Sequence, residues 1–287
     1  MKRVIFIVLI LFWTAILRLF NLDKVPTLFH PSSYLPRLDT VVLSLLNIYL
    51  SYKLTTYYSN KVKVGLLSAF ILAVLPWTLE EGRVYSTVNN GCAILLAGIF
   101  LWQKLQTQWA KIFISLITIV AFSIFYPDIW FLRSFKLIPV LNFRDNLFRL
   151  LSQEMWFFSN TTFYHGGLRE WGFIFLSLFP FFVYGLIKFF IKKAIRVFIL
   201  LGIIVIVAAL SPYFPESREF FLVTPFLSLI IGKGLYEFVL IKKNAYHLIT
   251  FIFIFFIVYE IFQLLHFYFV HYPLNVNDSV NKIYEPF

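Results

Sequence analysis

Long apolar segments occupy most of the chain, and they constrain its fold more than any other feature. A helix that crosses the ~30 Å hydrocarbon core of a bilayer needs ~20 mostly apolar residues at ~1.5 Å each. We therefore expect an all-α fold, a polytopic transmembrane helical bundle of about nine spans. The predicted spans are Val4–Phe20, Val41–Tyr58, Val62–Leu79, Val88–Trp102, Ala110–Tyr126, Trp171–Ile191, Val197–Leu210, Phe220–Leu240 and Tyr246–Val270.

Composition favours a membrane protein over a soluble one. Of the 287 residues, 60% are hydrophobic and 14% are charged, whereas a soluble domain is ~45–50% apolar and ~25% charged. That much apolar surface cannot be buried in one soluble core, so it has to face membrane lipid. The net charge of +11 comes from basic residues scattered between the apolar segments. This pattern indicates membrane orientation, and we expect no nucleic-acid partner.

The charged residues divide between the two sides of the predicted bundle. Short connections on one side carry lysine and arginine without acidic residues, and the positive-inside rule makes this side cytoplasmic. Twelve of the 14 acidic residues fall on the opposite side. We expect the N-terminus in the cytoplasm and the C-terminus outside, in the plasma (inner) membrane of a prokaryote. The cytoplasmic residues are Lys2, Arg3, Lys61, Lys63, Lys104, Lys111, Lys188, Lys192, Lys193, Arg196, Lys242 and Lys243.

This topology divides the chain into a bundle, residues 1–270, and a short outer tail, residues 271–287. The outer loops of the bundle are residues 21–40, 80–87, 127–170 and 211–219. The third loop mixes aromatic and basic residues, among them Phe143, Arg144, Phe148 and Arg149. Such a mixture predicts either an amphipathic segment in the headgroup region or a structural plug on the bundle.

The outer loops place carboxylates next to cations. Glu80, Glu81 and Arg83 follow the third predicted span, and Arg169 and Arg218 precede later ones. A planar guanidinium pairs bidentately with phosphate, so these arginines could together hold a lipid phosphate or diphosphate. A nearby carboxylate could then act as general base on an acceptor hydroxyl. The alternative for each arginine is headgroup anchoring or a local ion pair.

Several other chemistries lack a motif in this chain. There is no P-loop and no Gly-rich dinucleotide fingerprint. The five histidines show no metal-ligand spacing, and the five-residue separation of His266 and His271 does not suit one helix face. The single Cys92 excludes an internal disulfide. We predict no metal-ligating residues and no certain cofactor. Dependence on a divalent metal ion is left open, although no motif indicates it.

Two acidic residues lie inside predicted spans. Glu260 is costly in hydrocarbon and should face the bundle interior, either in a structural role or paired with a polar partner. Glu237 should extend towards the cytoplasmic interface near Lys233 and Lys242.

Six stretches, in chain order, resemble one family of membrane enzymes. They are RLFNLDKVPTLFHP (18–31), PRLDTVVLSLLNIYLSYKL (36–54), LPWTLEEGRVYS (75–86), NTTFYHGGLREWGFIFLSLFPFFVYGL (160–186), SPYFPESREFFLVTPFLSLIIGKGLYEF (211–238) and YFVHYPLN (268–275). Together they are similar to the polytopic GT-C glycosyltransferases, in the branch of protein mannosyltransferases and the aminoarabinose transferase.

The resemblance implies transfer of a sugar from a polyprenyl-phosphate donor to an acceptor at the non-cytoplasmic face. It implies lipid-phosphate binding by Arg83, Arg218, Arg169 and His165. Where the family has an acidic pair in its first outer loop, this chain has Ser32 and Ser33, and serine cannot act as a carboxylate base. The candidate substitute acids are Glu80, Glu81 and Asp39.

Three hypotheses follow for function. The first is a shortened GT-C-like glycosyltransferase, a hexosyl- or pentosyltransferase that uses a lipid-linked sugar and an unknown acceptor. The second is a catalytically inactive relative or partner subunit that keeps the lipid site. The third is a lipid or solute transporter, for which Glu260 is the one clear mid-membrane candidate.

Overall fold

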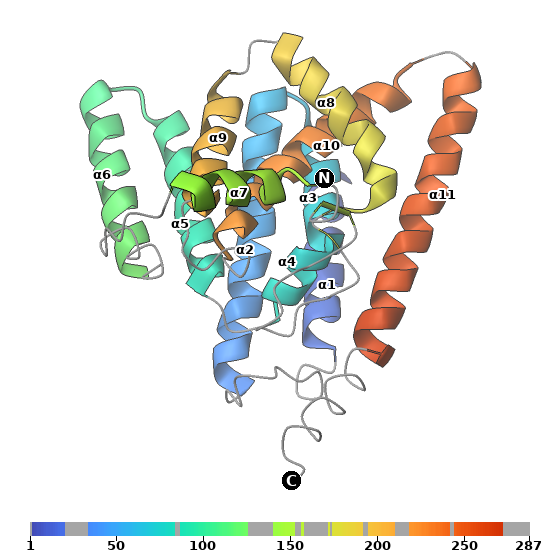
Figure 1. Cartoon of the computed structure of the whole chain (residues 1–287), viewed down its shortest axis with the longest axis horizontal. Coiled ribbons are helices and arrows are strands. Elements are labelled where there is room, and N and C mark those ends of the chain that lie inside the picture. Colours follow the sequence, from blue (N-terminus) through green and yellow to red (C-terminus); the bar gives the residue numbers. More distant parts are fainter. Residues whose placement is uncertain are drawn as a thin grey trace, which may run out of the picture.

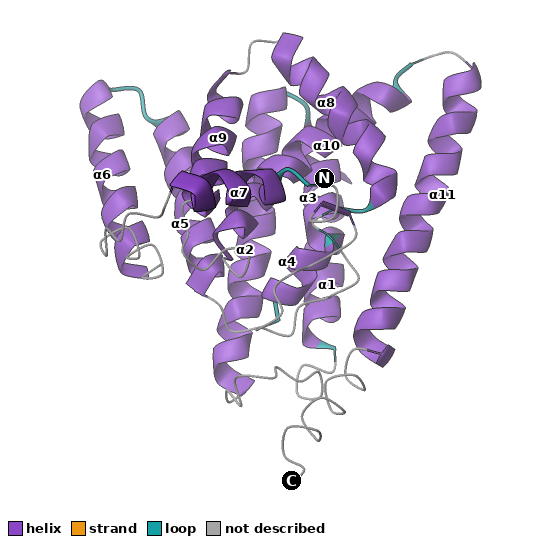
Figure 2. Ribbon diagram, viewed as in Figure 1, coloured by secondary structure: helices purple, strands orange, loops and turns teal. Residues whose placement is uncertain are grey.

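The computed structural model is all-helical over the residues that it describes (Figure 1, Figure 2). The elements are α1 (Lys2–Leu19), α2 (Tyr34–Ser59), α3 (Val62–Val74), α4 (Pro76–Glu81), α5 (Thr87–Lys104), α6 (Gln108–Phe125), α7 (Val140–Leu150), η4 (Leu176–Leu178), α8 (Phe179–Ile191), α9 (Ile195–Ala209), η5 (Arg218–Val223), α10 (Thr224–Val239), α11 (Asn244–His266) and η6 (Phe267–His271). The described residues are 2–20, 34–83, 87–125, 140–152, 156–157, 172, 174–191, 195–209, 218–241 and 244–271.

Each predicted apolar segment contains a helix or two consecutive helices. By length and composition, three of these helical segments suffice to cross a membrane: Gln108–Phe125, Phe221–Val239 and Leu248–His271. Four others are apolar but shorter: Val4–Leu19, Val62–Val74, Leu176–Ile191 and Val197–Ile206. The protein is therefore a helical membrane protein, and the crossing of the membrane by all nine segments stays a prediction.

The third predicted span is not one continuous helix. It breaks at Leu75, whose ψ of 139° is extended, and α4 begins at Pro76. Proline disfavours the α conformation in the residue before it and has no N–H for the carbonyl one turn back. That carbonyl belongs to Leu72, and it accepts a hydrogen bond from the Thr78 hydroxyl instead. The Thr78 hydroxyl therefore replaces the N–H donor that Pro76 lacks.

Helix α10 forms the centre of the bundle. Every residue from Thr224 to Leu235 is buried. Where α10 meets α2 and α3, Ser228 lies 3.0 Å from Ser68 and 3.4 Å from Ser51, and Thr55 donates to Ser68 at 3.1 Å. Within a bilayer, the hydrophobic effect does not drive helices together, because lipid tails are as apolar as the side chains. Close packing and interhelical hydrogen bonds hold the helices together instead.

Glycines allow α8 and α10 to approach each other closely. A Cβ added at Gly234 would overlap the Phe181 carbonyl oxygen, and one at Gly185 would overlap the Ile230 carbonyl oxygen. The two backbones therefore touch at this crossing. Small residues allow such a close approach between membrane helices.

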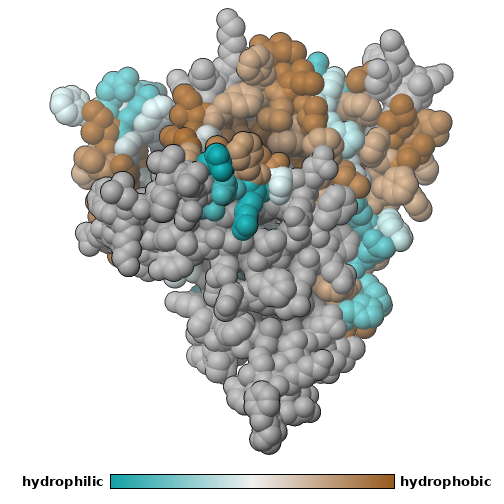
Figure 3. All heavy atoms as spheres, in the orientation of Figure 1, coloured by the Kyte–Doolittle hydropathy of each residue, from teal (hydrophilic) through white to brown (hydrophobic). Residues whose placement is uncertain are grey.

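Apolar side chains cover the periphery. Figure 3 shows them gathered over α6, α8 and α11. No residue of α6 is buried, and Phe113 on α6 and Phe251 and Phe262 on α11 are among the most exposed side chains. Such a surface would aggregate in water, and it fits a lipid environment.

The helix ends that flank the predicted cytoplasmic loops lie together. In Figure 1 the ends of α2, α5, α8 and α10 and the starts of α3, α6, α9 and α11 all lie at the top of the bundle. At this end, Glu237 pairs with the buried Lys233 and lies 3.5 Å from Lys61. Lys233 was the expected neighbour, Lys61 was not, and Lys242 lies outside the described residues. Which end faces the cytoplasm stays a prediction.

Helices extend into the predicted outer loops, most clearly in the first and the third. Helix α2 begins at Tyr34, inside the first predicted loop, and Pro36 fits because N–H groups in a first helical turn have no partner in the helix. Helix α7 lies within the third loop and runs across the bundle (Figure 1). Its Arg144, Phe148 and Arg149 are exposed, while Leu150 is buried.

The glycine crossing gives a stability prediction. Gly234→Ala should lower the free energy of unfolding by about 1–3 kcal/mol, because the methyl group must separate α8 from α10. The matched control is Gly202→Ala in α9, where an added Cβ meets nothing within 4 Å. Alanine there should leave stability unchanged or raise it, since it favours helix. Thermal unfolding of the detergent-solubilised protein measures both; equal melting temperatures for the two variants would contradict the assignment.

Candidate functional site

A buried polar cluster lies where α1, α2, α4 and α5 meet. The break at Pro76 directs the short helix α4 into the protein, so that Glu80 and Glu81 are only 7% and 5% exposed. Arg83, two residues after α4, is also buried. The sequence placed these residues on an exposed outer loop. The structure keeps them together but withdraws them from the surface.

Arg18 is the centre of this cluster, and the sequence did not single it out. Its side chain is completely buried. Its Nε donates to Ser44 Oγ at 2.7 Å, and its Nη2 donates to the Thr78 carbonyl oxygen at 2.9 Å. Its Nη1 lies 3.4 Å from the Ala73 carbonyl oxygen, at the end of α3. The available signal was an arginine between two leucines at the end of an apolar span.

Arg83 binds the other end of the same junction. Its Nη1 donates to the carbonyl oxygens of Leu17 at 2.8 Å and Phe20 at 2.7 Å, at the end of α1. Its guanidinium carbon lies 5.3 Å from the centre of the Tyr268 ring and 5.1 Å from that of Phe269, a cation–π arrangement. Arg83 thus joins α1 to η6. The engagement of Nη1 by these carbonyls limits how Arg83 could meet a phosphate.

Arg18 contacts the segment that carries the two glutamates and Arg83. Arg18 contacts α4 through the Thr78 carbonyl, and a Cβ at Gly82 would overlap Arg18 Nε. Two guanidinium groups buried near each other require negative charge close by. Glu80 and Glu81, in the last turn of α4, are the acidic residues nearest to Arg83 along the chain.

Asparagine side chains extend the cluster towards α5. Asn89 donates to the Glu81 carbonyl oxygen, and Asn47 Nδ2 lies 3.3 Å from Asn89 Oδ1. A small cavity between Asn47, Asn89 and Thr224 leaves only about 10 Å³ for the centre of a water molecule. That is room for one water and not for a sugar.

The structure describes only some of the remaining predicted site residues. Asp39 is exposed on α2, five residues before Ser44, and hence about 7.5 Å away along the helix axis. Arg218 is the first residue of η5, but its side chain is not described. His165 and Arg169 lie outside the described residues, as do Ser32 and Ser33. The structure therefore brings Glu80, Glu81 and Arg83 together and leaves the others untested.

The expectation that His266 and His271 do not share a helix face is wrong. The chain ends α11 in the π-helical turn η6, in which residues five apart lie on one face. The two Nε2 atoms are 3.2 Å apart, and both side chains are exposed. Two imidazoles alone make an incomplete metal site. Among the described residues no group of three or more His, Cys, Asp or Glu could hold a metal ion.

Glu260 faces a helix end, which supplies the polar partner that the sequence could not identify. Its carboxylate accepts hydrogen bonds from the backbone N–H groups of Leu176 at 3.1 Å and Ser177 at 3.2 Å, and from the Ser177 hydroxyl. These N–H groups open η4 and α8, where no earlier turn supplies acceptors. Glu260 therefore caps a helix from a neighbouring helix, a structural role.

Comparison with known proteins found no match among protein-family models, curated proteins or solved structures.

Removing Arg18 should destabilise the protein strongly. Arg18→Met keeps an apolar chain of similar length but leaves the Thr78 carbonyl and Ser44 without this donor in a buried site. We expect a loss of about 3 kcal/mol in the free energy of unfolding. Arg149→Met, an exposed arginine on α7, is the control and should change little. Chemical unfolding in detergent measures both, and similar losses would show that Arg18 does not hold the junction.

The capping role of Glu260 predicts a graded series. Glu260→Ala removes every acceptor and should lower stability by about 1–2 kcal/mol, whereas Glu260→Gln keeps one acceptor oxygen and should lose less. Gln263→Ala, exposed on the same helix, is the control. Melting temperatures that do not follow this order would contradict the capping assignment.

Proposed function

We propose that this protein is a membrane glycosyltransferase of the GT-C type that uses a polyprenyl-phosphate sugar at the non-cytoplasmic face. The observation that carries the proposal is the cluster of Glu80, Glu81, Arg83 and Arg18 at one junction of an otherwise apolar bundle. Three of these residues belong to the stretch 75–86, one of the six that resemble the family. Charged groups are expensive within a membrane bundle and usually mark functional sites.

The reaction requires a carboxylate and a cation. The acceptor hydroxyl attacks the anomeric carbon of the donor sugar, its proton passes to the carboxylate, and the bond to the lipid phosphate breaks. An arginine stabilises the charge on the departing phosphate. Arg218, at the start of η5, is the arginine that the resemblance assigns to this task, alongside Arg83.

Three carboxylates compete for the role of base, and the structure distinguishes their surroundings. Asp39 is exposed and open to an acceptor. Glu80 and Glu81 are nearly buried and lie on the segment that contacts Arg18. Access favours Asp39, whereas proximity to the arginines favours the glutamates. The partners in this proposal are membrane lipid, the polyprenyl-phosphate donor and an acceptor that is not identified.

A second candidate is an inactive relative that binds the lipid-linked donor without transferring the sugar. It is supported by the engagement of Arg83 Nη1 with the α1 carbonyls and by the burial of Glu80 and Glu81. The transporter hypothesis loses support, because Glu260, its mid-membrane candidate, is engaged in capping η4 and α8.

Activity separates these candidates. The purified protein in lipid nanodiscs, given polyprenyl-phosphate-linked sugars and a mixture of acceptors, should release free polyprenyl phosphate. Arg218→Ala should abolish the release. Among Asp39→Asn, Glu80→Gln and Glu81→Gln, loss of the base should slow release by about 100-fold or more. Asp145→Asn, an exposed acid on α7, is the control.

Each outcome has a distinct meaning. Release that survives all three carboxamide substitutions would contradict a base among these residues. Donor binding without release by the wild-type protein would favour the inactive relative. Neither binding nor release with any polyprenyl-phosphate sugar would overturn both candidates.

A further inference from the structure

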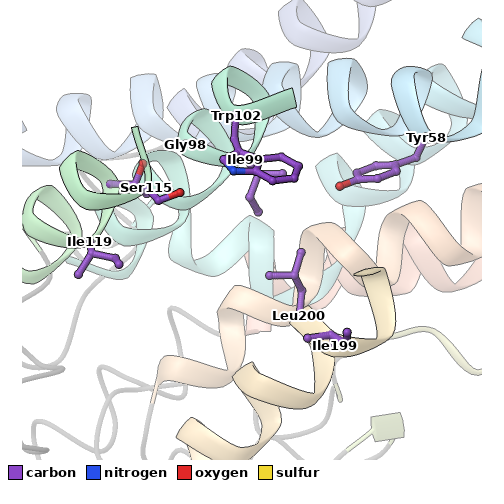
Figure 4. Close-up of a pocket in the computed structure, with 9 residues that line it drawn as sticks. Tyr58, Gly98, Ile99, Trp102, Ser115, Ile119, Ile199 and Leu200 are labelled. Atoms are coloured by element: carbon purple, nitrogen blue, oxygen red, sulfur yellow. The ribbon is translucent and has the colours of Figure 1, made fainter. Parts of the chain in front are cut away.

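A lateral cavity opens at the lysine-bearing end of the bundle, away from the Arg18 cluster. It has a volume of about 370 Å³, within the range of small-molecule sites. Its walls come from the end of α2, from α5, from α6 and from α9, as Figure 4 shows. Tyr58 and Trp102 are directed into it from α2 and α5, and Leu200 faces them from α9.

The lining suits a hydrocarbon chain. Ser115 and Thr118 are the polar lining residues on α6. Their hydroxyl groups donate to the carbonyl oxygens of Lys111 and Ile114, one turn back, at 2.8 and 2.7 Å. What they present to the cavity is therefore mainly methylene and methyl surface. A sugar or nucleotide needs several convergent polar groups, whereas an acyl chain needs none.

The cavity is continuous with the surface that faces lipid. Ile119 on α6 and Ile199 on α9 line it and are 62% and 54% exposed. No residue of α6 is buried, so this helix closes the cavity only from one side. A lipid chain can therefore enter sideways from the bilayer.

Lys111 contacts the lining of the cavity, and Lys104 follows the lining residue Trp102 by two positions on α5. Lys111 Nζ lies 5.0 Å from the centre of the Trp102 ring, which lines the cavity, and Lys104 Nζ lies 5.7 Å from that of Phe100. Lys111 precedes Ser115 by one turn, about 6 Å along α6. Neither lysine forms an ion pair with a carboxylate of the described residues. The charge of these lysines is thus available to an anion.

We propose that this groove binds one anionic phospholipid of the adjacent leaflet, with an acyl chain in the cavity and its phosphate against Lys104 and Lys111. Trp102 lies between chain and headgroup, the depth at which its amphipathic ring is favoured. The apolar lining selects a chain, and the lysines select the negative headgroup. The site is independent of the proposed glycosyl transfer, because it shares no described residue with the Arg18 cluster.

The test compares two lipids with the same acyl chains. The purified full-length protein is titrated with palmitoyl-oleoyl phosphatidylglycerol or phosphatidylcholine, and bound lipid is counted by native mass spectrometry. Phosphatidylglycerol should bind about 25-fold more tightly, since each lysine near an anionic surface contributes about fivefold. Inorganic phosphate alone should not compete, because it lacks the chain.

Matched variants separate the two parts of the site. Lys104→Gln combined with Lys111→Gln should abolish the preference for phosphatidylglycerol, whereas Lys63→Gln, an exposed lysine on α3 at the same end, should keep it. Ser115→Trp fills the cavity and should weaken both lipids about tenfold, as expected when two methylene groups stay unburied. Ser123→Trp, two turns along α6 and outside the cavity, is its control.

The proposal is overturned if the wild-type protein binds the two lipids equally, or if Ser115→Trp binds them as the wild type does. Competition by inorganic phosphate would instead indicate an anion site without a lipid chain and would also overturn it. Melting temperatures of all four variants establish that each is folded, so that a loss of binding reports on the groove.

Discussion

The fold depends on hydrogen-bond partners for the ends of its helices, because no water reaches these ends within a membrane. Within hydrocarbon, every backbone N–H and C=O must find a partner in the protein. Three ends in this bundle do so through side chains from other segments. Arg83 binds the last carbonyls of α1, Arg18 binds the Ala73 carbonyl at the end of α3, and Glu260 binds the first N–H groups of η4 and α8. Each charge has the sign that the helix dipole favours, cations at carboxyl ends and an anion at an amino end.

These contacts explain how short helices can form a stable bundle. Helix α3 has only 13 residues and α8 also has 13, so neither gains much from its own length. The break at Pro76 is tolerated because Thr78 and Arg18 take over the carbonyls that it frees. The hydroxyl cluster around Ser228 and the glycine crossing of α8 and α10 then hold the middle of the bundle, where no charge is needed.

The sequence predicted the elements better than their contacts. Apolar runs are local, so each predicted segment proved helical, and the adjacency of Glu80, Glu81 and Arg83 along the chain kept them together in space. Their burial was not predictable from the hydropathy of the loop, because it results from the turn at Pro76. The partner of Glu260 lies more than 80 residues away, and only a π-helical turn brings His271 to His266. Such long-range or irregular geometry leaves no periodic signal.

The burial of the charged groups also bears on which carboxylate an acceptor could reach. Main-chain carbonyls accept hydrogen bonds from Arg18 and Arg83, which satisfies these buried donors. Glu80 and Glu81 are nearly buried on the segment that contacts Arg18, and such burial suits a structural role. Asp39 is exposed on α2, where an acceptor hydroxyl can approach it. Access therefore favours Asp39 over the two glutamates as the carboxylate that meets the acceptor.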